Sequence, residues 1–182
     1  MYSPAEVARR YVETGKSKAA LPVGRMLLLG MLAGAFIALA GGSATFAVSY
    51  GGRLAGAAVF PAGLAMVLLA GSELFTGNCL LVIPLLERQL TWGRMLRSWG
   101  VVYLANVLGA GLVAALTVAA GTFDGVYESV VATAAAKAGL PFLTALLRGV
   151  LCNFLVCIAV WMSLAAQSVP GKLAAMYLPI FT

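Results

Sequence analysis

Histidine is absent from this 182-residue sequence, and charged residues make up only 10% of it. Aspartate and glutamate together number six, and only Glu73 lies inside a long apolar run. The apolar runs hold no histidine, no pair of aspartates and no cluster of metal-ligating side chains, which are the usual groups of an active site. We therefore expect no enzymatic activity, no cofactor and no metal site.

Cysteine is also scarce. Cys79, Cys152 and Cys157 are an odd number, and their spacing matches no common metal motif. All three lie in apolar runs, where a free thiol behaves as a small hydrophobic group. The sequence predicts three buried thiols that form neither disulfides nor metal ligands.

Apolar residues are abundant, at 62% of the chain, and the mean hydropathy is +0.99. Such values predict an all-α integral membrane protein that forms a single transmembrane domain over residues 1–182. An amphipathic helix on the cytoplasmic surface is expected at 2–20. Membrane spans are expected at about 26–50, 53–86 (broken at 72–78), 92–120 and 140–167, with the start of a fifth at 172–182. The last segment is too short to cross a bilayer, so we expect a truncated member or a fragment of a longer protein.

The basic residues predict the orientation of these spans. Nine of the twelve lysines and arginines lie at the ends of the spans on the same side of the membrane as the N-terminus. The span ends on the opposite side have only Arg53 and Lys137. By the positive-inside rule the N-terminus is cytoplasmic, in a multi-pass protein of the bacterial inner membrane. The net charge of +6 thus reflects topology, and no nucleic-acid partner is implied. The expected partner of the protein is the lipid bilayer.

The second span is too long for one straight helix. Its 33 residues from Leu54 to Leu86 would reach about 50 Å, whereas the hydrocarbon core is about 30 Å thick. A glycine-flanked polar stretch, Gly71–Asn78, lies inside it. Unwinding at 72–78 would give two half-helices around a loop, which survives at membrane depth only where it lines a cavity. The alternative is a kinked helix of purely structural role.

This break offers Leu74, Phe75 and Thr76 to a pore. Phe60 and Leu64 lie four residues apart on the preceding half-helix and share a face. Apolar constrictions of this kind gate a pore by excluding water. Aromatic and leucine side chains at helical spacing also occur as ordinary core, so the pore assignment depends on the break.

Two further polar residues suit an anion. Lys137 stands sixteen positions before Asn153, which places the ammonium at the outer mouth and the amide near mid-membrane. The ammonium would attract anions and the amide could donate to a carboxylate. An interfacial lysine and an interhelical hydrogen bond are the structural alternatives. Arg148 is costly inside a span, so we expect a structural interaction with Glu73, or a contact of either side chain with the free backbone groups at the break. A direct role of either residue in transport is the alternative.

Three motifs resemble the formate/nitrite transporter family: Gly71–Asn78 (GSELFTGN), Thr91–Gly93 (TWG) and Arg148–Trp161 (RGVLCNFLVCIAVW). The resemblance implies an aquaporin-like inverted-repeat fold, present here incompletely, in a homopentamer with one pore per protomer. It implies a channel for small monovalent anions, formate or nitrite, coupled to protonation of the anion. A hydrosulfide channel of the same family and a non-transporting remnant are the alternatives.

The resemblance also implies which residues line the pore. These are Phe60, Leu64, Leu74, Phe75, Thr76, Lys137, Asn153 and Val156. The family has a central histidine on a broken fifth span, and this chain has none. We therefore expect residues 1–182 alone not to be a selective, proton-linked channel.

Overall fold

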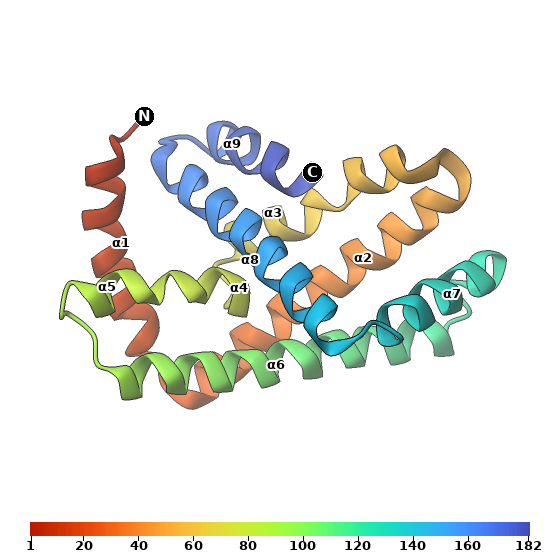
Figure 1. Ribbon diagram of the computed structural model, residues 1–182, viewed down its shortest axis with the longest axis horizontal. Helices are drawn as coiled ribbons and strands as arrows, with labels where there is room; N and C mark the ends of the chain where they lie inside the picture. Colours follow the sequence, from red (N-terminus) through yellow and green to blue (C-terminus); the bar gives the residue numbers. More distant parts are fainter.

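The computed structural model describes residues 1–182 and is all-helical. In chain order the elements are α1 (Pro4–Ala19), α2 (Val23–Val59), α3 (Pro61–Ala70), α4 (Phe75–Asn78), the 3₁₀ turn η1 (Cys79–Leu81), α5 (Val82–Leu86), α6 (Trp92–Ala119), the 3₁₀ turn η2 (Asp124–Val126), α7 (Tyr127–Ala138), α8 (Phe142–Ala165) and α9 (Val169–Phe181). Figure 1 shows α6 along the longest axis of the molecule, α2 and α8 inclined to it in opposite directions, and both termini in the upper half of the view.

The helices long and apolar enough to cross a membrane are α6, α8 and the continuous run of α2 and α3. That run is not straight, because Gly52 has a φ of 75° and turns the chain back on itself (Figure 1). Glycine adopts this conformation without steric cost. The turn separates a first span, which ends at Gly51, from the outer half of the second. Two shorter apolar helices, Phe75–Leu86 and Val169–Phe181, complete the set.

The second span is broken, but the break differs from the predicted 72–78. Helix α3 ends at Ala70, Gly71 is left-handed with a φ of 65°, and the helix resumes at Phe75. The non-helical part is therefore 71–74. The helix restarts early because the side-chain Oδ1 of Asn106 accepts a hydrogen bond from the Phe75 N–H at 2.8 Å. This contact satisfies a donor that the first turn of a helix leaves without a partner.

Helices α2 and α6 pack with their backbones almost in contact. A Cβ atom added at Gly34 would collide with the backbone of Asn106, and one at Gly109 would collide with the carbonyl of Met31. Small residues permit this approach between membrane helices, where van der Waals contact replaces the hydrophobic driving force. Gly111, on the other side of α6, faces open space. The two helices thus form a closely fitted pair.

Helix α1 lies against the inner half of the broken span (Figure 1). It begins at a cap in which the Ser3 hydroxyl accepts a hydrogen bond from the Glu6 N–H. Its buried side chains, Val7, Tyr11, Gly15 and Ala19, recur at helical spacing and form one face. Because Gly15 has no Cβ, α1 approaches the Pro84 ring, which a side chain there would meet at 2.8 Å. The helix is therefore fixed to the protein.

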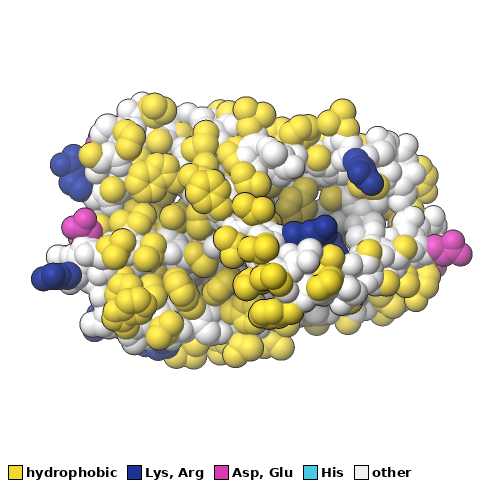
Figure 2. Space-filling view, viewed as in Figure 1, with side chains coloured by type: hydrophobic (Ala, Val, Ile, Leu, Met, Phe, Trp, Pro, Cys, Tyr) yellow, Lys and Arg dark blue, Asp and Glu magenta, His cyan; other side chains and the backbone are white.

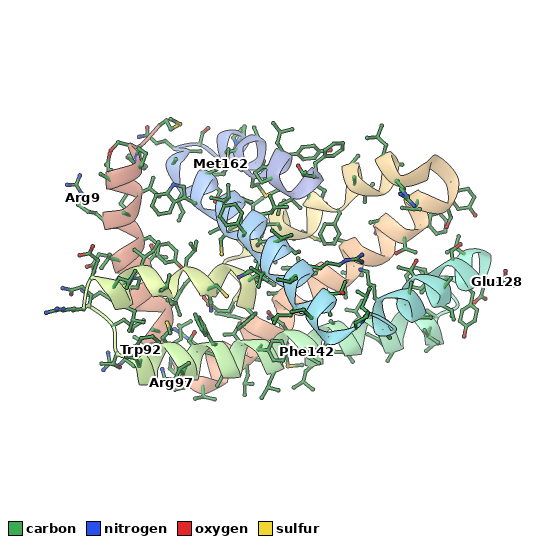
Figure 3. All side chains as sticks on the ribbon, viewed as in Figure 1. Arg9, Trp92, Arg97, Glu128, Phe142 and Met162 are labelled. Carbon is green, nitrogen blue, oxygen red and sulfur yellow. The ribbon has the colours of Figure 1, made fainter.

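The surface between the two ends is largely apolar (Figure 2). Large hydrophobic side chains on α6 and α8 are exposed, among them Leu104, Leu108 and Phe154. Arg9 and Arg97 lie toward one end of the molecule and Glu128 at the other (Figure 3). An apolar band between polar ends suits a bilayer. The connection after α6 contains helix α7.

One cysteine prediction is wrong. Cys152 is exposed on α8 rather than buried, because its face of the helix has no neighbouring element in this chain. Cys79 and Cys157 are half-buried, and all three thiols are free.

Candidate functional site

The peptide groups of the break and of the turn after it are held by partners from four surrounding helices. The Glu73 N–H donates to the Leu29 carbonyl of α2 at 3.1 Å. Side chains donate to four carbonyls of the segment: Asn106 Nδ2 to Glu73 at 2.9 Å, Cys157 Sγ to Thr76 at 3.3 Å, Tyr11 Oη to Gly77 at 3.3 Å and Trp99 Nε1 to Asn78 at 2.8 Å. Backbone groups at membrane depth need such partners. Residues 1–182 thus supply partners for these peptide groups themselves.

Asn106 contributes most to this arrangement. Its Oδ1 accepts from the Phe75 N–H, and its Nδ2 donates to the carbonyls of Gly30 at 2.8 Å and Glu73 at 2.9 Å. One amide thereby connects α2, α6 and both sides of the break. Sequence reasoning missed this residue, although a single amide in an otherwise apolar span was a usable signal.

The carboxylate of Glu73 is nearly enclosed, with 5% of its side chain exposed. Oε1 lies 2.8 Å from the Lys18 Nζ, and Oε2 accepts a hydrogen bond from Asn78 Nδ2 at 2.8 Å. The predicted interaction with Arg148 is therefore wrong. Helix α8 contacts the break at Cys157, nine residues or about 13 Å along the helix from Arg148, while α1 brings Lys18 directly to the carboxylate.

Three of the predicted pore residues come together in one apolar cluster. Its buried members are Ala33, Leu64, Val67, Leu74, Ala159, Val160 and Met176, and Val156 packs against them. Phe75 is not among them. Its ring packs edge-to-face on Trp99 and Tyr103 of α6, with centroids 6.3 and 5.3 Å apart. Leu64, Leu74 and Val156 thus meet, whereas Phe75 points to α6.

Two cavities lie on either side of this cluster. The outer cavity, about 600 Å³, is lined by residues of α2, Phe60 and the α7 residues Ser129, Ala132, Thr133 and Lys137. The inner cavity, about 230 Å³, is lined by Leu64, Leu74, Glu73, Lys18 and Tyr11 among others. Phe60 and Leu64 are about 6 Å apart along the chain axis, since each residue of a helix rises about 1.5 Å. Phe60 at the outer cavity and Leu64 at the inner cavity are therefore separated by about one helical turn.

Cys157 contacts both Thr76 and Asn153. The Cys157 thiol donates to the Thr76 carbonyl and lies 4.0 Å from Asn153 Oδ1. The Thr76 hydroxyl is buried and has no hydrogen-bond partner in the chain. Buried hydroxyls are usually paired, so this one is a candidate ligand group.

Tyr11 lines the inner cavity from the surface helix. Burial, followed by the nearby Glu73 carboxylate, raises the pKa of its phenol well above the ordinary value of 10.0. Both causes disfavour a negative charge at this site. Tyr11 therefore stays protonated and donates its hydrogen bond to Gly77 across the physiological range.

The family model described as "Formate/nitrite transporter" matches residues 5–182. The chain belongs to the formate/nitrite transporter family. It is 38% identical to an uncharacterised transporter, YrhG, of Bacillus subtilis, over 97% of this chain and 71% of the relative. It is 34% identical to a probable formate transporter of Methanothermobacter thermautotrophicus, over 98% of this chain and 75% of the relative.

A solved structure described as a pentameric formate channel with formate bound superposes on the chain with a TM-score of 0.73. The identity is 28%, and the match covers 87% of this chain and 67% of that structure. The fold is therefore the formate/nitrite transporter fold, an all-helical membrane architecture that the chain represents in part. Proteins of this family are anion channels and transporters, not enzymes.

Proposed function

We propose that this chain forms the larger part of a pore for small monovalent anions, with formate as the first candidate and nitrite as the second. The observation that carries the proposal is the outer cavity, where Lys137 and Phe60 line one space about one helical turn from the apolar cluster of Leu64 and Leu74. Formate is favoured because the Methanothermobacter thermautotrophicus relative is described as a probable formate transporter and the superposed structure as a formate channel.

The arrangement suits a weak acid. The Lys137 ammonium attracts an anion into the outer cavity. A carboxylate loses too much hydration to enter an apolar barrier, whereas its neutral conjugate acid enters at far lower cost. Transport is therefore coupled to protonation of the anion. Thr76 on α4 and Asn153 on α8 supply a hydroxyl and an amide that bind the polar end of the acid.

The assembly that we propose is a homopentamer, because the superposed channel is described as pentameric. We place it in the bacterial inner membrane with a cytoplasmic N-terminus. The basic residues at the α1 end support this orientation (Figure 3). Tags at residue 2 and near Glu87 should report the cytoplasm, and a tag near Gly125 should report the outside. A cytoplasmic signal from Gly125 would contradict the topology, and cross-linking that stops at dimers would contradict the pentamer.

Transport is tested in liposomes, by uptake of labelled formate with the outside at pH 5, 6 and 7. Two proteins are compared: residues 1–182, and the same residues joined to the remaining quarter of the Methanothermobacter thermautotrophicus relative, which should restore the central histidine that the family resemblance implies. We expect saturable uptake that rises as the pH falls for the joined protein, and none for residues 1–182. Equal uptake by both would show that the added segment is dispensable.

Two substitutions in the joined protein test the site. Lys137→Ala and Thr76→Val should each lower uptake, because one removes the attracting charge and the other removes the hydroxyl at constant shape. Lys172→Ala is the matched control, since Lys172 is exposed on α9 and lines neither cavity. Unchanged uptake in both site variants would refute the proposed path, and uptake of hydrosulfide but not formate would refute the substrate.

A further inference from the structure

Two cysteines from distant parts of the sequence meet beside the break. Cys79 follows Phe75 by one helical turn and donates from Sγ to the Phe75 carbonyl at 3.4 Å. Cys157 comes from α8 and donates from Sγ to the Thr76 carbonyl at 3.3 Å. Consecutive carbonyls of one helical turn point in nearly the same direction along the helix axis. The two thiols therefore contact neighbouring carbonyls at the same end of α4.

A third side chain adjoins both thiols. Asn153 precedes Cys157 by one turn on the same face of α8, and its amide lies 4.0 Å from the Cys157 Sγ and also beside the Cys79 thiol. Both cysteines are half-buried, and neither has another side-chain partner. The third cysteine, Cys152, lies exposed on another face of α8.

We propose that Cys79 and Cys157 form a binding site for one soft, closed-shell metal ion of the Cu(I), Ag(I) or Hg(II) class. Thiolates are the protein ligands that select such ions, and two of them suffice for the linear coordination that these ions favour. On binding, each thiol loses its proton to solvent and each sulfur forms one bond to the metal, with no change of oxidation state. A coordinated thiol is deprotonated outright, so burial of the free thiols does not prevent binding.

Binding has a structural consequence. The metal would replace two weak S–H donors with a covalent-strength bridge between α8 and the inner half-helix of the broken span. Phe75 and Thr76 would then be fixed relative to α8. The inference does not depend on which anion is transported, or on transport at all, so it can be tested on purified residues 1–182.

The probe is Ag(I), which needs no reductant, titrated in chloride-free detergent solution and followed by the ultraviolet absorption of silver–thiolate bonds. We expect the first Ag(I) added per chain to bind Cys79 and Cys157 together, because two thiolates hold the ion more tightly than the single exposed thiolate of Cys152. At one Ag(I) per chain, Cys79 and Cys157 should be protected from alkylation by N-ethylmaleimide in peptide mass spectra, and Cys152 should not. Cys79→Ser and Cys157→Ser should each weaken Ag(I) binding by more than about 100-fold. Mutation of a residue that only hydrogen-bonds to a metal ligand already lowers metal affinity by about 10–100-fold, so loss of a ligand should lower it further.

Serine retains a donor for the carbonyls of Phe75 and Thr76, so these variants should keep the fold, and circular dichroism of each verifies it. Cys152→Ser is the matched control and should bind Ag(I) as tightly as the unchanged chain. Wild-type affinity in either single variant, or equal alkylation of Cys79 and Cys157 with and without Ag(I), would overturn the proposal. Loss of the bound ion in Cys152→Ser would overturn it as well.

Discussion

Replacing Asn106 with leucine tests how the break is stabilised. Leucine has a similar volume and fits the apolar span, so the main change is the loss of three hydrogen bonds. The Gly30 carbonyl keeps its place in the α2 helix, but the Phe75 N–H and the Glu73 carbonyl lose their side-chain partner. A buried polar group without a partner costs about 1–3 kcal/mol, so two of them predict a loss of about 2–6 kcal/mol in the free energy of unfolding.

Interhelical hydrogen bonds in membranes contribute about 0.6 kcal/mol each on average, because the polar groups find other partners in the unfolded state. Three such bonds give about 2 kcal/mol, the lower end of the expected range. The assay is reversible unfolding in sodium dodecyl sulfate, followed by tryptophan fluorescence. Asn153→Leu is the matched control. The Asn153 amide lies 4.0 Å from the Cys157 Sγ and also adjoins the Cys79 thiol, and thiols are weak hydrogen-bond partners, so its loss should cost under about 1 kcal/mol. Equal losses in the two variants would refute the assigned role of Asn106.

Three further changes test the packing, the ion pair and the surface helix by the same unfolding assay. Gly109→Ala should lower the free energy of unfolding by about 3 kcal/mol, the upper end of the usual cost of overpacking, because its Cβ would meet the backbone of α2. Gly111→Ala is the control and should leave stability unchanged; equal losses would contradict the close packing of α2 and α6. Lys18→Ala should lower the free energy of unfolding by about 2–3 kcal/mol. This is less than the roughly 3–5 kcal/mol of a fully buried pair, because 25% of the lysine side chain is exposed. Adding Glu73→Gln should restore part of the lost stability, because it removes the unpaired charge. The Tyr11 pKa is raised on folding, so above pH 10 the native state keeps a proton that the unfolded state loses, and stability should fall by up to about 1.4 kcal/mol per pH unit. Tyr11→Phe should flatten that fall, and an unchanged slope would contradict it.

The sequence was most informative where a property depends on one segment. The excess length of Leu54–Leu86 predicted a broken span, and a glycine does begin the break, at Gly71. The extent of the break could not be predicted, because the helix resumes at Phe75 only through an amide on α6, thirty-one residues later. A local pattern contains no information about such a distant partner.

Pairings across the fold were the least predictable part. Glu73 was assigned to Arg148 because both are charged and both lie in apolar runs, but the position of α1 decides the matter and supplies Lys18. That position depends on a buried face of α1 and on the contact of Gly15 with Pro84. The cysteines were similar: spacing in sequence excluded a metal motif, while the fold places Cys79 and Cys157 at one end of α4.

The close fit of α2 and α6 determines which parts of the protein can move. Where a Cβ would already strike the opposing backbone, at Gly34 and Gly109, neither helix can slide or rotate without a steric clash. Asn106 fastens the break to this pair, so the three form one rigid frame. Helix α8, by contrast, is tied to the break by a single thiol hydrogen bond and packs mainly on α9. We therefore expect that any widening of the apolar cluster involves a movement of α8 and α9 relative to the α2–α6 pair, because α8 is held to the break only by that hydrogen bond and by apolar contacts.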